Sequence, residues 1–187
     1  AGLKRFYRHL LFLHPDVWLV YDELEADHPA RWSWLAHSPY KIQMDSARNS
    51  FAAANGKGGA RVALYGSQPV RWSLSDTFGV AAVNWLGRED EEGNLIEYKN
   101  DQWHVTAETV DKIPRMRFLA VFRVKPGEAG GGMLPVRPDS KGALTIDGWT
   151  IHAELDPMRP ARLEAYNKAR HAAFTSAGGS LRVAGVT

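Results

Sequence analysis

His37 and Tyr40 are the two side chains whose types and spacing best fit acid–base chemistry. They flank the Ser38-Pro39 dipeptide at the end of a predicted strand, so a turn there can bring an imidazole and a phenol together. Asp22, on a neighbouring predicted strand, is a candidate third member of a site with His37 and Tyr40. The alternative is a hydrogen-bonded structural histidine beside a half-buried aromatic. We treat His37 and Tyr40 as substrate-binding candidates and assign no catalytic residue.

Aromatic side chains provide a second kind of candidate site, because their ring faces can stack against sugar rings. The chain has seven Trp and six Tyr. Trp85 and Trp149 are substrate-binding candidates from a group that also contains Trp72 and Trp103. The alternative is that each fills a hydrophobic core, as aromatic residues commonly do in β proteins.

Composition excludes several other functions. The chain of 187 residues has a formal charge of +2, from 23 basic and 21 acidic residues that are interspersed. The sequence has no Lys/Arg tract of the kind that binds a nucleic-acid backbone and no apolar run long enough to span a bilayer. Neither nucleic acid nor membrane is therefore an expected partner. There is no cysteine. The acidic segment 88–94 lacks the spacing of a calcium loop and is predicted to be a surface excursion.

Motifs of common enzyme classes are also missing from the sequence. It contains no Gly-x-Ser-x-Gly elbow, phosphate-binding loop, His-Glu-x-x-His helix or dinucleotide fingerprint. We therefore expect no metal and no cofactor in this chain, and we do not expect an independent enzyme.

The elements that must position these candidates are strands. Short runs of β-branched, aromatic and Leu residues recur every 8 to 12 residues, separated by turn residues, which is typical of an antiparallel sandwich. The predicted strands are 6–13, 17–24, 30–37, 40–44, 50–54, 61–65, 70–74, 103–110, 115–124, 144–146 and 149–155. A turn is expected at Asp27-His28-Pro29. Alternation in 17–24 places apolar side chains on both faces, as in a central strand covered on both sides.

Two further features concern the later strands. Arg115, Arg117 and Arg123 alternate along one of them and are predicted to form its solvated face. Segment 160–174 has some helical character, but we favour strands there, followed by a final hairpin that includes 181–183.

The predicted organisation is one all-β, antiparallel β-sandwich with a possible small appendage. The main sandwich spans 1–126, and a flexible glycine-rich loop occupies 127–132. Segment 133–187 supplies the last strands of the same sandwich or a small β-rich appendage.

Three linked blocks resemble the carboxy-terminal β-sheet region of the heparinase II/III-like polysaccharide lyases. They are Arg8-His9-Leu10-Leu11-Phe12-Leu13-His14-Pro15-Asp16, Val20-Tyr21-Asp22-Glu23-Leu24-Glu25-Ala26 and Trp34-Leu35-Ala36-His37-Ser38. The resemblance implies an enzyme with an α/α-toroid followed by antiparallel sandwich domains. Such enzymes cleave uronic-acid polysaccharides by β-elimination, in the periplasm or outside the cell.

The toroid and the upstream catalytic motif of that family have no counterpart in this sequence. The resemblance therefore implies a non-catalytic module, inactive alone, that packs on an upstream catalytic toroid and shapes the cleft for an acidic polysaccharide. The alternative is a stand-alone carbohydrate-binding sandwich, for which the tryptophan content argues.

Overall fold

The described residues fold into three antiparallel β-sheets, which confirms the predicted all-β, sandwich-like architecture. The structure is a computed structural model that describes residues 2–77, 89–94, 102–126, 134, 138–140, 142–177 and 180–185. These residues contain one short 3-10 helix, η1 (Ser46–Arg48), and no α-helix. No helix within the described ranges is long and apolar enough to cross a membrane.

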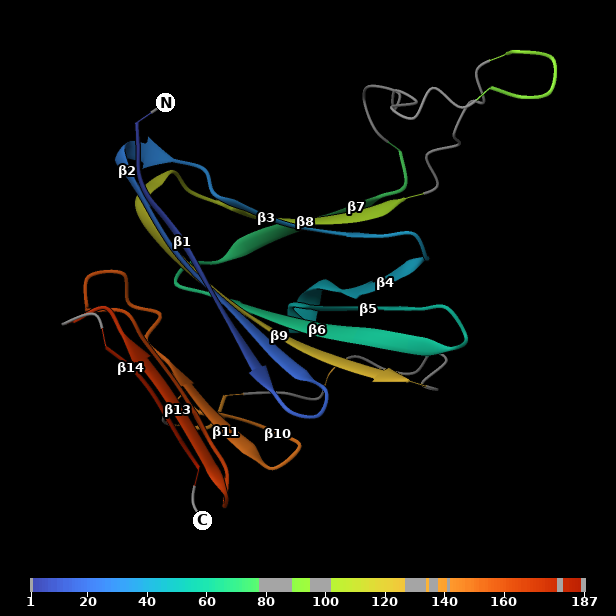
Figure 1. The fold of residues 1–187 in the computed structure, drawn as a ribbon. Coiled ribbons are helices and arrows are strands. Elements are labelled where there is room, and N and C mark those ends of the chain that lie inside the picture. Colours follow the sequence, from blue (N-terminus) through green and yellow to red (C-terminus); the bar gives the residue numbers. More distant parts are fainter. Residues whose placement is uncertain are drawn as a thin grey trace.

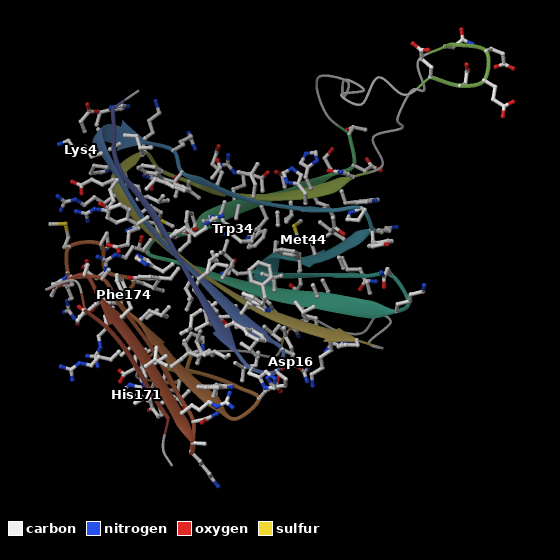
Figure 2. The ribbon with its side chains drawn as sticks, in the orientation of Figure 1. Lys4, Asp16, Trp34, Met44, His171 and Phe174 are labelled. Carbon is white, nitrogen blue, oxygen red and sulfur yellow. The ribbon has the colours of Figure 1, made fainter. Side chains whose placement is uncertain are left out.

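The largest sheet has six strands in the order β1-β2-β9-β6-β5-β4. Its strands are β1 (Leu3–Leu13), β2 (Val17–Ala30), β4 (Ile42–Asp45), β5 (Ser50–Ala54), β6 (Gly58–Gly66) and β9 (Ile113–Pro126). The long β1–β2 hairpin runs from Lys4 at one end of the sheet to the turn containing Asp16 at the other (Figure 2). β9 pairs with β2 on one side and with β6 on the other.

Two smaller sheets flank the six-stranded sheet. One has the order β3-β8-β7 and contains β3 (Ser33–Ser38), β7 (Val70–Ser75) and β8 (Trp103–Thr109). The other has the order β10-β11-β12-β13-β14 and contains β10 (Leu144–Ile146), β11 (Trp149–Ala153), β12 (Arg162–Tyr166), β13 (Arg170–Thr175) and β14 (Ser180–Gly185). The six-stranded sheet thus forms the middle layer of three (Figure 1).

Each pair of layers encloses its own hydrophobic core. Leu19, Tyr21 and Leu119 of the middle sheet meet Trp149 and Ile151 of the five-stranded sheet in the first core. In the second core, side chains of the middle sheet meet Trp34, Val105 and Ala107 of the three-stranded sheet. Figure 2 shows Trp34 and Met44 between these two sheets.

The predicted burial of both faces of β2 is confirmed except at Trp18, which is 42% exposed. Val17, Leu19 and Tyr21 lie in the first core, whereas Val20 and Leu24 contact the second. Period-2 alternation with apolar residues in both positions is what a strand in the middle of three layers requires.

The prediction of a turn at Asp27-His28-Pro29 is wrong. These residues belong to the end of β2, whose register against β9 shifts between Glu25 and Ala30. The extra residues form a bulge in a continuing strand, and the backbone N–H of Asp27 donates to the carbonyl of Gly2.

The prediction of a solvated face for the β9 arginines is wrong at Arg117. This side chain is buried, and its guanidinium donates to the carbonyls of Glu154 at 3.0 Å, Asp156 at 2.7 Å and Arg159 at 2.6 Å. Arg117 is on the face of β9 that the five-stranded sheet covers, so it holds the β11–β12 connection against the middle sheet.

Segment 160–174 forms strands, as favoured from the sequence. β12 and β13 pair in register from Arg162 opposite Thr175 to Tyr166 opposite His171, and β13 continues into the expected hairpin with β14. The glycine-rich segment 127–132 lies outside the described residues.

Candidate functional site

The structure places His37 and Tyr40 at the exposed end of the three-stranded sheet. His37 lies on β3 directly opposite His104 of β8, with ring centroids 5.9 Å apart. Tyr40 follows β3 and is exposed, and its backbone N–H donates to Ser38 Oγ at 3.0 Å. Asp22 belongs to a different sheet and binds Arg8, so it does not join them as a third member.

The two tryptophan candidates are not brought together with this pair. Trp149 is 4% exposed and packs in the first core, so protein covers most of its ring where a sugar platform would be open. Trp85 lies outside the described residues. Trp72 and Trp103 are partly buried against the second core, and Trp72 Nε1 donates to Asn49 Oδ1 at 3.0 Å.

A group of exposed apolar side chains lies on β1 and the start of β2, and sequence reasoning did not select it. Phe6 is 57% exposed, Leu10 65%, Phe12 43% and Trp18 of β2 42%. Because they alternate along β1, and Trp18 lies opposite Phe12, all four point to one face of the hairpin. We call this set the β1 apolar face. The rings of Phe12 and Trp18 stack with centroids 4.4 Å apart.

An ion pair between the exposed Arg8 and the buried Asp22 interrupts the β1 apolar face. Arg8 lies between Phe6 and Leu10 in the alternation, and its Nε and Nη2 donate to the two carboxylate oxygens of Asp22 at 2.7 and 2.9 Å. The hydrogen bond to Asp22 raises the pKa of Arg8 above its ordinary value, although partial burial opposes it. The bidentate geometry fixes the position of the Arg8 guanidinium, and Phe6 and Leu10 on either side of it are exposed.

The opposite face of β1 borders the five-stranded sheet along a groove. The groove consists of two hollows of about 360 and 300 Å³ that share Leu11 and Ala172 in their walls. His9 lies at its edge, where Nε2 is 2.9 Å from Glu23 Oε1 and the ring is 4.1 Å from that of Phe174. Val183 of β14 lies opposite Ala172 and is on the same face of the five-stranded sheet, the face towards β1, yet it is 75% exposed.

The backbone of β1 gives this region a third property. Among the described strands β1 pairs with β2 alone, so its other edge offers hydrogen-bonding groups to a further strand. An edge strand with apolar side chains on one exposed face and an apolar groove along the other is suited to receive a strand and a packing surface from elsewhere.

One signal in the sequence points to this site. Both alternating sets of β1 are apolar: Phe6, Leu10 and Phe12 in one and Leu11 and Leu13 in the other. The same pattern in β2 marks a covered central strand, and the sequence does not tell which of the two strands is at the edge.

Comparisons with known proteins found no family model that matches the chain. No curated protein matches it either.

Proposed function

We propose that this chain is a non-catalytic β-sandwich module of a heparinase II/III-like polysaccharide lyase, acting outside the cytosol, and that β1 is where it joins the rest of the enzyme. The observation that carries the proposal is the edge strand β1, which has apolar side chains on both faces and exposes Phe6, Leu10 and Phe12 on one of them. The three blocks of sequence that resemble the family lie on β1, β2 and β3.

The energetics favour a partner that buries the β1 apolar face. Four large side chains, each roughly half exposed, would each contribute on the order of 1 kcal/mol when covered. A strand added to the free edge would also form hydrogen bonds with the backbone of β1. It would cover Val183, which among the described residues has no strand of the middle sheet opposite it.

Charge pairing on β1 indicates the chemistry of the partner surface. Arg8 is bound to Asp22, and Arg5 lies within 4 Å of carboxylates of Glu23 and Glu25. Since β2 already balances these cations, the partner needs apolar side chains opposite β1 more than carboxylates. The helical toroid and adjoining strands of the parent enzyme fit that description, and the module would then form one wall of the cleft for an acidic polysaccharide.

Activity of the isolated chain tests the first part of the proposal. We expect no release of unsaturated uronide from uronic-acid polysaccharides, followed by its ultraviolet absorbance. Measurable release that depends on this chain would contradict a non-catalytic role.

Reconstitution tests the second part. The chain is mixed with the separately produced toroid-containing part of the parent enzyme, and binding is measured by calorimetry. Leu10→Lys combined with Phe12→Lys should weaken binding by at least about tenfold, which corresponds to about 1.4 kcal/mol. Leu35→Lys is the matched control, because Leu35 is an exposed leucine on β3. Equal affinities of the β1 variant and the control would refute docking through β1.

A further inference from the structure

A cluster of polar and aromatic side chains lies on the outer face of the five-stranded sheet. In β12, Leu163 and Ala165 point inward to the first core, so Arg162, Glu164 and Tyr166 point outward. Cross-strand partners on the same outer face come from the neighbouring strands: His152 lies opposite Glu164, and His171 lies opposite Tyr166. We call these five residues, Arg162, Glu164, Tyr166, His152 and His171, the β12 cluster.

The rings of the β12 cluster form a platform. Tyr166 is exposed, and its ring is nearly parallel to that of His152, at 16° and with centroids 5.9 Å apart. That separation is larger than the distance between rings stacked directly face to face, so the two rings are offset. Together they offer a wider surface than either ring alone. The ring of His171 meets Tyr166 edge-on, with centroids 6.2 Å apart.

The polar groups of the β12 cluster hold one another in place. Glu164 Oε1 is 2.8 Å from His171 Nε2, and Glu164 Oε2 accepts from Arg162 Nη2 at 2.7 Å. Burial raises the pKa of Glu164, but the hydrogen bond from His171 and the charge and hydrogen bond of Arg162 outweigh it, and the pKa lies below its ordinary value. The carboxylate therefore stays ionised and keeps its acceptor sites at neutral pH.

A hollow of about 360 Å³ adjoins the platform, lined by His152, Ala153, Glu154, Arg162 and Glu164. Its walls offer carboxylate acceptors and a guanidinium donor side by side. Such planar groups bind vicinal hydroxyls through paired hydrogen bonds, whereas two carboxylates disfavour a phosphate or sulfate group.

We propose that the β12 cluster is a saccharide-binding site, with a pyranose ring stacked on Tyr166 and His152 and its hydroxyls bound by Glu164 and Arg162 in the adjoining hollow. The nearly parallel rings of the exposed Tyr166 and the partly buried His152 supply a surface for the C–H face of a sugar. The mutually bonded charged groups supply preorganised donors and acceptors at one end of that surface. This inference does not depend on the docking role of β1, because the two surfaces lie on different sheets.

The test uses the isolated chain and ¹H–¹⁵N NMR titration with two defined sugars, tetragalacturonate and a neutral glucan tetrasaccharide. Either sugar should shift amide signals of residues 152, 164–166 and 171, with a dissociation constant on the order of 1 mM or tighter. Shifts with both sugars indicate recognition by ring stacking and hydroxyls. Shifts with the uronate alone would contradict that recognition, because the two carboxylates of the hollow disfavour a further anionic group.

Tyr166→Ala should weaken binding at least about fivefold, which corresponds to about 1 kcal/mol of stacking energy. Tyr166→Phe keeps the ring and should keep most of the affinity. Tyr7→Ala is the matched control, since Tyr7 is an exposed tyrosine on β1 of the middle sheet, and it should bind as the unmodified chain does. Absence of shifts at these positions with both sugars, or equal binding by Tyr166→Ala and Tyr7→Ala, would overturn the inference.

Discussion

Tyr21→Phe tests how the five-stranded sheet is held to the middle sheet. Tyr21 is fully buried, and its hydroxyl donates to the carbonyl of Glu154 at 2.6 Å, across the first core. The substitution removes this hydrogen bond and leaves the ring. The carbonyl of Glu154 still accepts from Arg117 at 3.0 Å, so it keeps a partner. We therefore expect a loss of only about 1 kcal/mol in the free energy of unfolding at pH 8.

At high pH the order of the two stabilities should reverse, so that Tyr21→Phe becomes more stable than the unmodified chain. Burial, opposed by the charge of Arg117, raises the pKa of Tyr21 from 10.0 to about 12. A pKa that is higher in the folded than in the unfolded protein stabilises the fold. This stabilisation is complete below the pKa of the unfolded state and is lost as pH rises towards the pKa of the folded state. Two pKa units correspond to about 2.7 kcal/mol, which the unmodified chain loses between about pH 10 and 12 and Tyr21→Phe does not. The variant should become the more stable protein above about pH 11.

Urea unfolding followed by tryptophan fluorescence, at intervals from pH 8 to 12, measures both free energies. Tyr65, whose pKa burial also raises to about 12, is present in both proteins and cancels from the difference. Tyr40→Phe, on an exposed tyrosine, is the control and should follow the unmodified chain at every pH. If Tyr21→Phe remained less stable by the same amount at pH 12, the burial argument for Tyr21 would be refuted.

Three other substitutions have definite expected outcomes. Arg117→Met should destabilise the chain by about 2–4 kcal/mol in urea unfolding, because it removes three hydrogen bonds that a buried guanidinium donates, whereas Arg115→Met should cost less than about 1 kcal/mol. Leu10→Lys should change the free energy of unfolding by less than about 0.5 kcal/mol and reduce binding of an apolar dye, and a large destabilisation would mean that Leu10 is covered. Glu164→Gln should be less stable than the unmodified chain at pH 7, and the difference should disappear in acid, because a lowered pKa gives stability that is lost as pH falls through the folded value. Thermal unfolding from pH 3 to 7 measures this, and a difference unchanged at pH 3 would contradict it.

Strand positions were predictable because their signals are local. The predicted strands 50–54 and 144–146 coincide with β5 and β10. The Asp147-Gly148 dipeptide forms the expected hairpin turn, with φ of 46° and 81°, which are values that this pair tolerates. Alternation of side chains and the residue types of turns both depend on only a few neighbouring residues. They therefore indicate strands and turns even when the arrangement of the strands is unknown.

Features that depend on strand order were not predictable. Arg117 has the alternation of a solvated residue, but the β11–β12 connection, more than 30 residues later, provides its carbonyl partners. Asp22 is separated from His37 because β2 and β3 enter different sheets. The β12 cluster draws on three strands, so no spacing in the sequence reveals it. His37, Tyr40, Trp85 and Trp149 remain predictions as substrate-binding residues.

The place of β9 between β2 and β6 determines when the middle sheet can be completed. During synthesis the β1–β2 hairpin and the β4–β5–β6 meander emerge first, and each can pair locally. The two units acquire their shared neighbour only after residues 113–126 leave the ribosome, so their apolar faces stay open in the meantime. Pairings this distant in the chain slow folding, so assembly of this protein should be slow and sensitive to crowding by other nascent chains.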